Sequence, residues 1–123
     1  MSAKKNAAKD APDPLFEVCR QLPGVTEDVK WGNDLVFSVG GKMFAAFELP
    51  AGEPIGLKVE PALFSVLVQQ PGITPAPYMA RHFWVKLENR RVMPRGALEE
   101  LLRQAHAIVA AKLPKKVRAS LGL

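Results

Sequence analysis

Cysteine is almost absent from this chain of 123 residues, and the single one, Cys19, has no partner for an intramolecular disulfide. A zinc site that takes two or more cysteines is excluded for the same reason. Nothing points to an oxidising compartment, and the lysine-bearing N-terminus has no apolar segment of a secretory signal. No run of about 20 apolar residues is available to span a membrane. We therefore expect a cytoplasmic protein with no membrane partner.

Catalytic and cofactor-binding motifs are missing as well. The sequence has no P-loop, no dinucleotide-binding glycine motif and no Gly-Xaa-Ser-Xaa-Gly. His106 borders the apolar side of a predicted helix, and His82 has cations rather than a carboxylate beside it, so neither resembles a general base. Glu27 and Asp28 point to opposite faces of a predicted strand and cannot chelate one metal together. We expect no enzymatic activity, no metal site and no cofactor.

Positive charge is in excess and is unevenly distributed. Residues 1–80 hold seven Lys/Arg against nine Asp/Glu, a net charge of −2, whereas residues 81–123 hold ten against three, a net charge of +7. A cationic C-terminal third favours an anionic partner such as nucleic acid or an acidic surface. The alternative is a solvated basic face that aids solubility, which is the commoner meaning of such an excess.

Hydrophobic periodicity predicts the order helix, four strands, helix, strand, helix. The first helix starts at Asp13-Pro14, ends at Pro23-Gly24 and buries Cys19 as a structural residue. Gly40-Gly41 predicts a tight hairpin, because both positions tolerate a positive φ angle. The predicted strands are residues 26–31, 35–39, 42–49, 55–60 and 82–88, and the predicted helices are residues 13–22, 61–68 and 94–113.

Strands this close in sequence form an antiparallel meander, and amphipathic helices cover one of its faces. The prediction is an α+β domain with an antiparallel sheet of about five strands, helices on one face and the other face open to solvent. In the last strand, Phe83, Val85 and Leu87 are expected to face the core, and Trp84 the open face. The expected organisation is a disordered tail at 1–12, one domain at 13–118 and a tail at 119–123.

The stretch PYMARHFWVKL, residues 77–87, places aromatic rings among cations. Cations neutralise phosphates and rings stack on bases, so this stretch and the basic residues after it predict a nucleic-acid interface. The alternative is that Tyr78 packs its proline-rich loop onto the domain and that Trp84 is buried under this loop or against a neighbouring strand. The candidate DNA-binding residues are Tyr78, Arg81, His82, Trp84, Lys86, Arg90, Arg91, Lys115, Lys116 and Arg118.

The same region supports a second hypothesis, in which Tyr78 and Trp84 form an aromatic-walled cleft beside the proline-rich loop. Such an interaction module would bind a small aromatic ligand or an acidic protein partner without catalysis. The salt dependence of the binding affinity distinguishes the two hypotheses. Contacts with nucleic-acid phosphates weaken steeply with ionic strength, whereas stacking on a neutral ring hardly changes. A monomer is favoured, although the sequence does not fix the oligomeric state.

The sequence resembles the MmcQ/YjbR family of small bacterial proteins. The resemblance spans Leu15 to about Arg118 and implies a frataxin-like (CyaY-like) two-layer α+β sandwich, in agreement with the predicted element order. It also implies a DNA-binding function. The stretches that carry it are LPGVTEDVKWG (22–32), VFSVGGKMFAAF (36–47), IGLKVEP (55–61), PGITPAPYMARHFWVKLE (71–88) and AAKLPKKVR (110–118).

Overall fold

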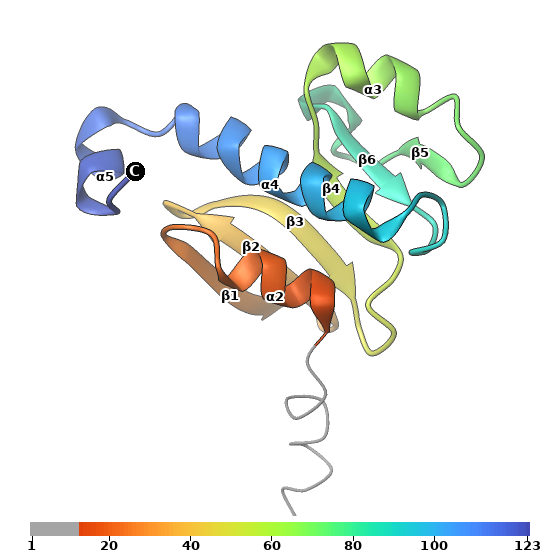
Figure 1. The fold of residues 1–123 in the computed structure, drawn as a ribbon, viewed down its shortest axis with the longest axis horizontal. Coiled ribbons are helices and arrows are strands. Elements are labelled where there is room, and N and C mark those ends of the chain that lie inside the picture. Colours follow the sequence, from red (N-terminus) through yellow and green to blue (C-terminus); the bar gives the residue numbers. More distant parts are fainter. Residues whose placement is uncertain (1–12) are drawn as a thin grey trace, which may run out of the picture.

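A computed structural model describes residues 13–123, and the tail predicted at residues 1–12 lies outside the described residues (Figure 1). One six-stranded antiparallel sheet has the strand order β1-β2-β3-β4-β6-β5. The α+β class with an antiparallel sheet is thus confirmed, with one strand more than expected. The strands are β1 (Val25–Lys30), β2 (Asp34–Val39), β3 (Lys42–Glu48), β4 (Ile55–Lys58), β5 (Ile73–Pro75) and β6 (Trp84–Leu87).

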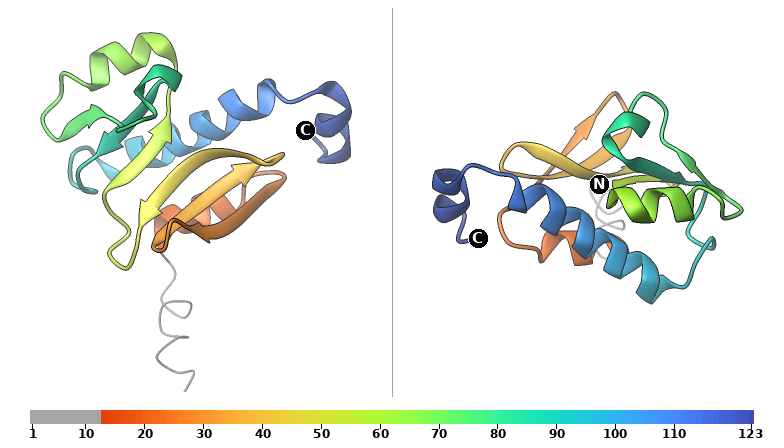
Figure 2. Two further views of the ribbon diagram at one scale, coloured as in Figure 1. Left: turned by 180° about the vertical axis from the view of Figure 1, so that it is seen from behind. Right: turned by 90° about the horizontal axis from the view of Figure 1, so that it is seen from above.

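Helices α2 and α4 lie side by side on one face of the sheet and leave the opposite face, here called the open face, without a covering helix (Figures 1 and 2). Helix α2 begins where predicted, because the Asp13 side chain accepts hydrogen bonds from the backbone N–H groups of Leu15 and Phe16. The helices are α2 (Pro14–Arg20), α3 (Pro61–Leu67), the 3₁₀ helix η1 (Ala80–His82), α4 (Arg95–Ala111) and α5 (Lys115–Ser120).

The core fills the space between the sheet and helices α2 and α4. The strands contribute three fully buried rings, Phe37, Phe44 and Phe47. Phe37 and Phe47 pack on Phe16 of α2, and Phe37 also packs on Phe44 and Phe47. His106 of α4 is buried edge-on against Phe44, and its Nε2 lies 2.8 Å from the Pro23 carbonyl oxygen. This histidine is therefore a packed residue, as its position beside the apolar stripe predicted.

Two predictions about strand ends were wrong. Phe83, expected to face the core from a strand over residues 82–88, has a φ angle of +62° and is 37% exposed, so β6 begins only at Trp84. Trp31, expected in a strand over residues 26–31, lies beyond the end of β1 with a φ angle of +51°. A left-handed residue ends the strand alternation, and nothing in the pattern of apolar residues signals it.

Cys19 is fully buried on α2, and its burial raises the pKa of the thiol to about 12, although the neighbouring Arg20 acts in the opposite direction. Because the thiolate is the reactive form of cysteine, we expect a thiol-specific disulfide reagent to leave the folded protein unmodified at neutral pH. In guanidinium chloride the same reagent should titrate the single thiol of the chain. A full thiol titre without denaturant would contradict this burial.

Candidate functional site

The centre of the open face is lined by small residues. In the sheet register, Ala46 of β3 lies opposite Gly56 of β4, which lies opposite Lys86 of β6. Gly56 has no side chain, and the ring of Trp84 lies beside it: a Cβ at this glycine would be 3.6 Å from Trp84 Cε3. A hollow of about 510 Å³ opens above these residues. We call it the aromatic cleft, lined by Trp31, Asp34, Met43, Ala46, Glu48, Pro54, Ile55, Gly56, Ala76, Pro77, Tyr78, Met79, Trp84 and Lys86.

Trp84 forms a buried wall of the aromatic cleft. It is 5% exposed but does not belong to the core cluster beneath the helices, because its side chain is on the open face. The Ala76 N–H donates to the Trp84 carbonyl oxygen at 3.0 Å, which holds the proline-rich loop beside the cleft. Burial against the sheet, the second of the two alternatives for this ring, is what the structure shows.

Trp31 and Tyr78 stand at the rim of the aromatic cleft with most of their surface in water, 66% and 98% exposed. Both have positive φ angles, +51° and +64°, which few residues other than glycine adopt. Tyr78 therefore does not pack the loop onto the domain, so that expectation was wrong for this ring. Large aromatic side chains are seldom left so exposed, and together the two rings form an apolar rim suited to covering a ligand.

Three charged side chains also line the cleft. Asp34 and Glu48 are cross-strand partners in β2 and β3, at the end of the sheet near Trp31, and Lys86 lies on the floor. None of the salt bridges among residues 13–123 involves these three side chains. A few polar groups in a mostly apolar hollow are typical of small-molecule sites, where they orient the ligand.

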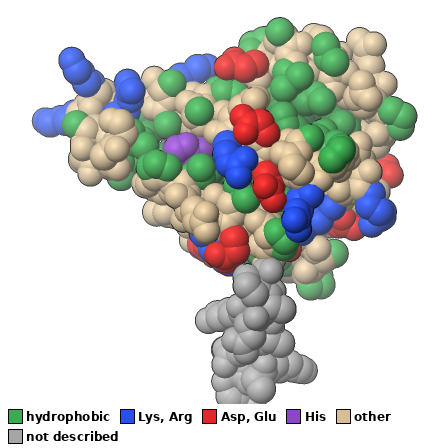
Figure 3. All heavy atoms as spheres, in the orientation of Figure 1, with side chains coloured by type: hydrophobic (Ala, Val, Ile, Leu, Met, Phe, Trp, Pro, Cys, Tyr) green, Lys and Arg blue, Asp and Glu red, His purple; other side chains and the backbone are tan. Residues whose placement is uncertain are grey.

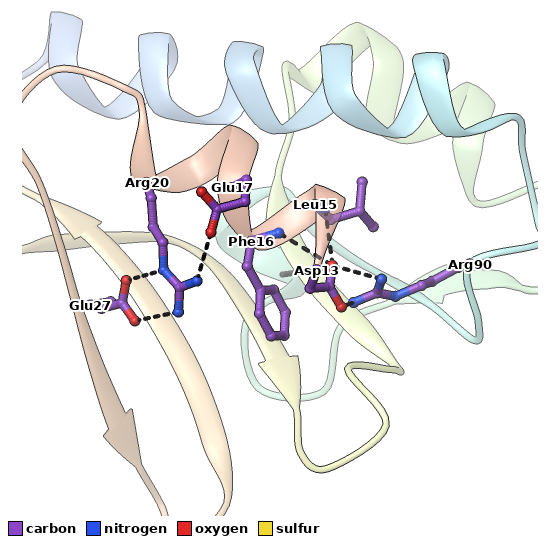
Figure 4. A network of polar contacts seen from close by, with 7 residues as sticks. All are labelled: Asp13, Leu15, Phe16, Glu17, Arg20, Glu27 and Arg90. Carbon is purple, nitrogen blue, oxygen red and sulfur yellow. Dashed lines mark hydrogen bonds and ion pairs between the residues drawn. The ribbon is translucent and has the colours of Figure 1, made fainter. Parts of the chain in front are cut away.

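Arg90, predicted to contact phosphates, is partly buried and contacts other parts of the domain (Figure 4). Its guanidinium group forms two contacts of 2.8 Å with the Asp13 carboxylate and donates to the Gly52 carbonyl oxygen. It also lies 5.5 and 5.8 Å from the ring centroids of Phe16 and Phe47. The charge of Arg90 is therefore neutralised by Asp13, and the side chain joins α2 to the loop before α4.

The structure does not bring the ten predicted DNA-binding residues onto one surface. Tyr78, Trp84 and Lys86 line the aromatic cleft, and Arg81 and His82 are exposed on η1 beside it. The loop before α4 and helix α5 lie at opposite ends of α4, whose 17 residues span about 25 Å (Figure 1). The loop before α4 holds Arg90 and the exposed Arg91. Helix α5 holds the exposed Lys115, Lys116 and Arg118.

Acidic side chains separate the cations on one side of the molecule. On the side seen in Figure 3, Lys and Arg lie in several groups with Asp and Glu between them. Glu99, for example, contacts both Arg95 and Arg103 along α4, at 3.5 and 3.7 Å. This side therefore offers no continuous cationic surface to a polyanion.

Sequence reasoning missed part of the cleft. Trp31, Asp34 and Glu48 were not among the candidate residues, because they lie far along the chain from residues 77–87: Trp31 follows β1, Asp34 belongs to β2 and Glu48 belongs to β3. Gly56 gave a signal that was not used: a glycine in the middle of a cleanly alternating strand marks the close approach of another group. Here that group is the ring of Trp84.

Other kinds of site are absent from the described part of the chain. Among residues 13–123, no group of three or more His, Cys, Asp or Glu is placed to hold a metal ion. In the same range, no helix combines the length and apolar character needed to cross a bilayer. Every buried side-chain nitrogen or oxygen there has a hydrogen-bond partner. The candidate site is therefore the aromatic cleft.

Comparisons with known proteins identify relatives of the chain. The model of the YjbR family matches residues 20–108. The crystal structure of a Deinococcus radiodurans protein with a DUF419 domain is similar, with 31% identity and a TM-score of 0.79 over 89% of this chain and 86% of that one. A Pseudomonas syringae protein, 19% identical, shares the fold with a TM-score of 0.62 over 78% of this chain and 96% of that one. None of the curated proteins matches this chain.

Proposed function

This chain belongs to the YjbR family, and we propose that it binds a flat aromatic small molecule in the aromatic cleft, without catalysing a reaction. The observation that carries the proposal is a hollow of about 510 Å³ with Trp84 in its wall and two exposed rings at its rim. Small-molecule sites measure about 300–1,000 Å³ and are mainly apolar. Each stacked or edge-to-face ring pair adds about 0.5–1.5 kcal/mol beyond the burial of apolar area.

The charges in the cleft favour such a ligand over a nucleic-acid backbone. Asp34 and Glu48 repel phosphates that approach their end of the cleft, and Lys86, on the floor opposite Gly56, is the one Lys or Arg in the cleft lining. A flat ring needs no cation to stack on Trp31 or Tyr78. DNA binding through the basic C-terminal third stays a separate prediction, supported by the exposed cations of η1 and α5.

Substitution of Gly56 by valine tests this proposal. The added Cβ would meet Trp84 at an ordinary contact distance of 3.6 Å, and valine is favourable in a strand, so the variant should fold. Its methyl groups would occupy the floor of the cleft. Among flat aromatic compounds that quench the tryptophan fluorescence of the native chain, we expect Gly56→Val to weaken binding at least about tenfold, which corresponds to about 1.4 kcal/mol.

The matched control is Thr26→Val, which places the same side chain on the open face but on β1, where it does not line the cleft. Thr26→Val should bind the compounds as the native chain does. Failure of every compound in a broad panel to bind the native chain would refute the proposal. Equal affinity of the native chain and the Gly56→Val variant would place the ligand elsewhere.

A further inference from the structure

A second hollow, of about 390 Å³, lies next to the aromatic cleft. It is lined by three lysines, Lys42, Lys58 and Lys112, here called the lysine cluster, by His82, and by the apolar residues Met43, Val109, Leu113 and Pro114. Met43 lines both hollows, so the two adjoin at a single flexible side chain. An apolar hollow rich in rings and a basic hollow therefore stand next to each other.

The fold assembles the lysine cluster from three separate elements. Lys42 is the first residue of β3, Lys58 is the last residue of β4, and Lys112 directly follows α4. The Lys58 ammonium group donates to the His82 carbonyl oxygen at 2.7 Å, and this bond orients the Lys58 side chain toward η1. Among the salt bridges formed by residues 13–123, none involves a member of the cluster.

The three lysines form no salt bridge among residues 13–123, and Glu60 is the carboxylate that acts on the charge of Lys58. Burial and, secondly, the positive charge of Lys112 lower the pKa of Lys58, while Glu60 acts in the opposite direction. A bound anion would relieve this repulsion, and it would gain charge-assisted hydrogen bonds from several ammonium groups at once. The placement of three lysines around one hollow therefore favours an anionic group, and the positive charge of Lys112 near Lys58 is consistent with it.

We infer that the lysine cluster binds the phosphate group of a ligand whose flat ring occupies the aromatic cleft; this inference rests on the proposed function. Lys58 and Trp84 are cross-strand partners on the open face, with Cβ atoms about 5 Å apart as in any such pair. A ring lying against Trp84 thus brings its substituent within reach of Lys58. The chemical class is a nucleoside phosphate, either free or as a unit of a short single strand.

The two ends of β3 carry opposite charge, which sets the orientation of the ligand in the cleft. Strand β3 begins at Lys42 and ends at Glu48, whose cross-strand partner is Asp34. Seven residues of strand separate these ends by about 20 Å. A phosphate is therefore attracted to the lysine end of the cleft and repelled from the carboxylate end.

Calorimetric titration of the whole chain with adenosine, adenosine monophosphate and inorganic phosphate tests the inference. At low salt we expect the monophosphate to bind at least about tenfold more tightly than adenosine, as expected for one or two charge-assisted hydrogen bonds. The variant Lys58→Gln should remove this advantage and leave adenosine affinity unchanged. The control Lys30→Gln removes the same charge from β1, where it lines neither hollow, and should keep the advantage.

The outcomes separate this inference from the proposed function. Adenosine binding without any gain from the phosphate would keep the cleft as a ring site and overturn the role of the lysine cluster. If inorganic phosphate bound through the lysines but adenosine did not bind, the proposed function would be refuted. The inference that one ligand occupies both hollows would then be wrong as well. A short oligonucleotide that binds more tightly than the monophosphate, and loses that affinity in Lys58→Gln, would identify a nucleic acid as the source of the phosphate.

Discussion

Replacing Phe37 with alanine is expected to lower the free energy of unfolding by about 3–5 kcal/mol, a large part of the roughly 5–15 kcal/mol that holds a domain folded. Phe37 is fully buried, and its ring centroid lies 6.2, 6.5 and 5.8 Å from those of Phe16, Phe44 and Phe47. These neighbours come from α2 and β3, so they cannot close over the cavity without moving a helix or a strand.

Equilibrium unfolding in guanidinium chloride, followed by circular dichroism, measures this loss. The control is Phe83→Ala, which removes the same side chain from a site that is 37% exposed and contacts one other ring, Phe64, at 5.8 Å. We expect the control to lose only about 1 kcal/mol. Similar losses in both variants would mean that the rings around Phe37 do not form the main core.

Most of the fold follows from local signals in the sequence. The hairpin between β2 and β3 forms at Gly40-Gly41, where both residues take the positive φ angles that glycine tolerates, +58° and +79°. The proline at the first position of α2 and the Asp13 side chain before it start that helix. In each case a residue type with a strong backbone preference stands where the chain must turn or begin a helix.

The errors in the fold have a common cause. Phe83 and Trp31 take left-handed conformations that their residue types do not favour, so neither residue type signals where its strand begins or ends. Strand β5 has three residues, too few for an alternating pattern, and it is not among the five predicted strands. Ile73 anchors it, buried opposite Leu87 of β6.

The candidate site was predictable only in part. The neighbourhood of Tyr78 and Trp84 was identified from sequence, because aromatic residues beside a proline-rich loop are unusual enough to notice. The partner of Arg90 was not, because Asp13 is 77 residues away. The lysine cluster was missed for the same reason, since its members belong to three elements that only the folded chain brings together.

Loss of Arg90 is expected to be the second most damaging change among those proposed. Arg90→Ala should lower the free energy of unfolding by about 2–3 kcal/mol, somewhat below the 3–5 kcal/mol typical when one partner of a fully buried ion pair is removed. The guanidinium group is only partly buried, with 24% of its side chain exposed. Without it, the Asp13 carboxylate loses its partner, Gly52 loses a donor, and the rings of Phe16 and Phe47 lose a stacked cation.

The neighbouring Arg91 supplies the control, because it carries the same side chain one residue further along and is exposed to water, with no salt bridge among residues 13–123. Arg91→Ala should change the free energy of unfolding by less than about 0.5 kcal/mol.

The Arg90→Lys variant should lose an amount of stability between those of Arg90→Ala and Arg91→Ala, because an ammonium group keeps the charge but cannot make the bidentate contact with Asp13. The denaturant midpoints of the three variants, compared with that of the native chain, measure these losses in stability. If Arg90→Ala proved as stable as Arg91→Ala, then Arg90 would not fasten α2 to the loop before α4, and its charge would again be available for an anionic partner.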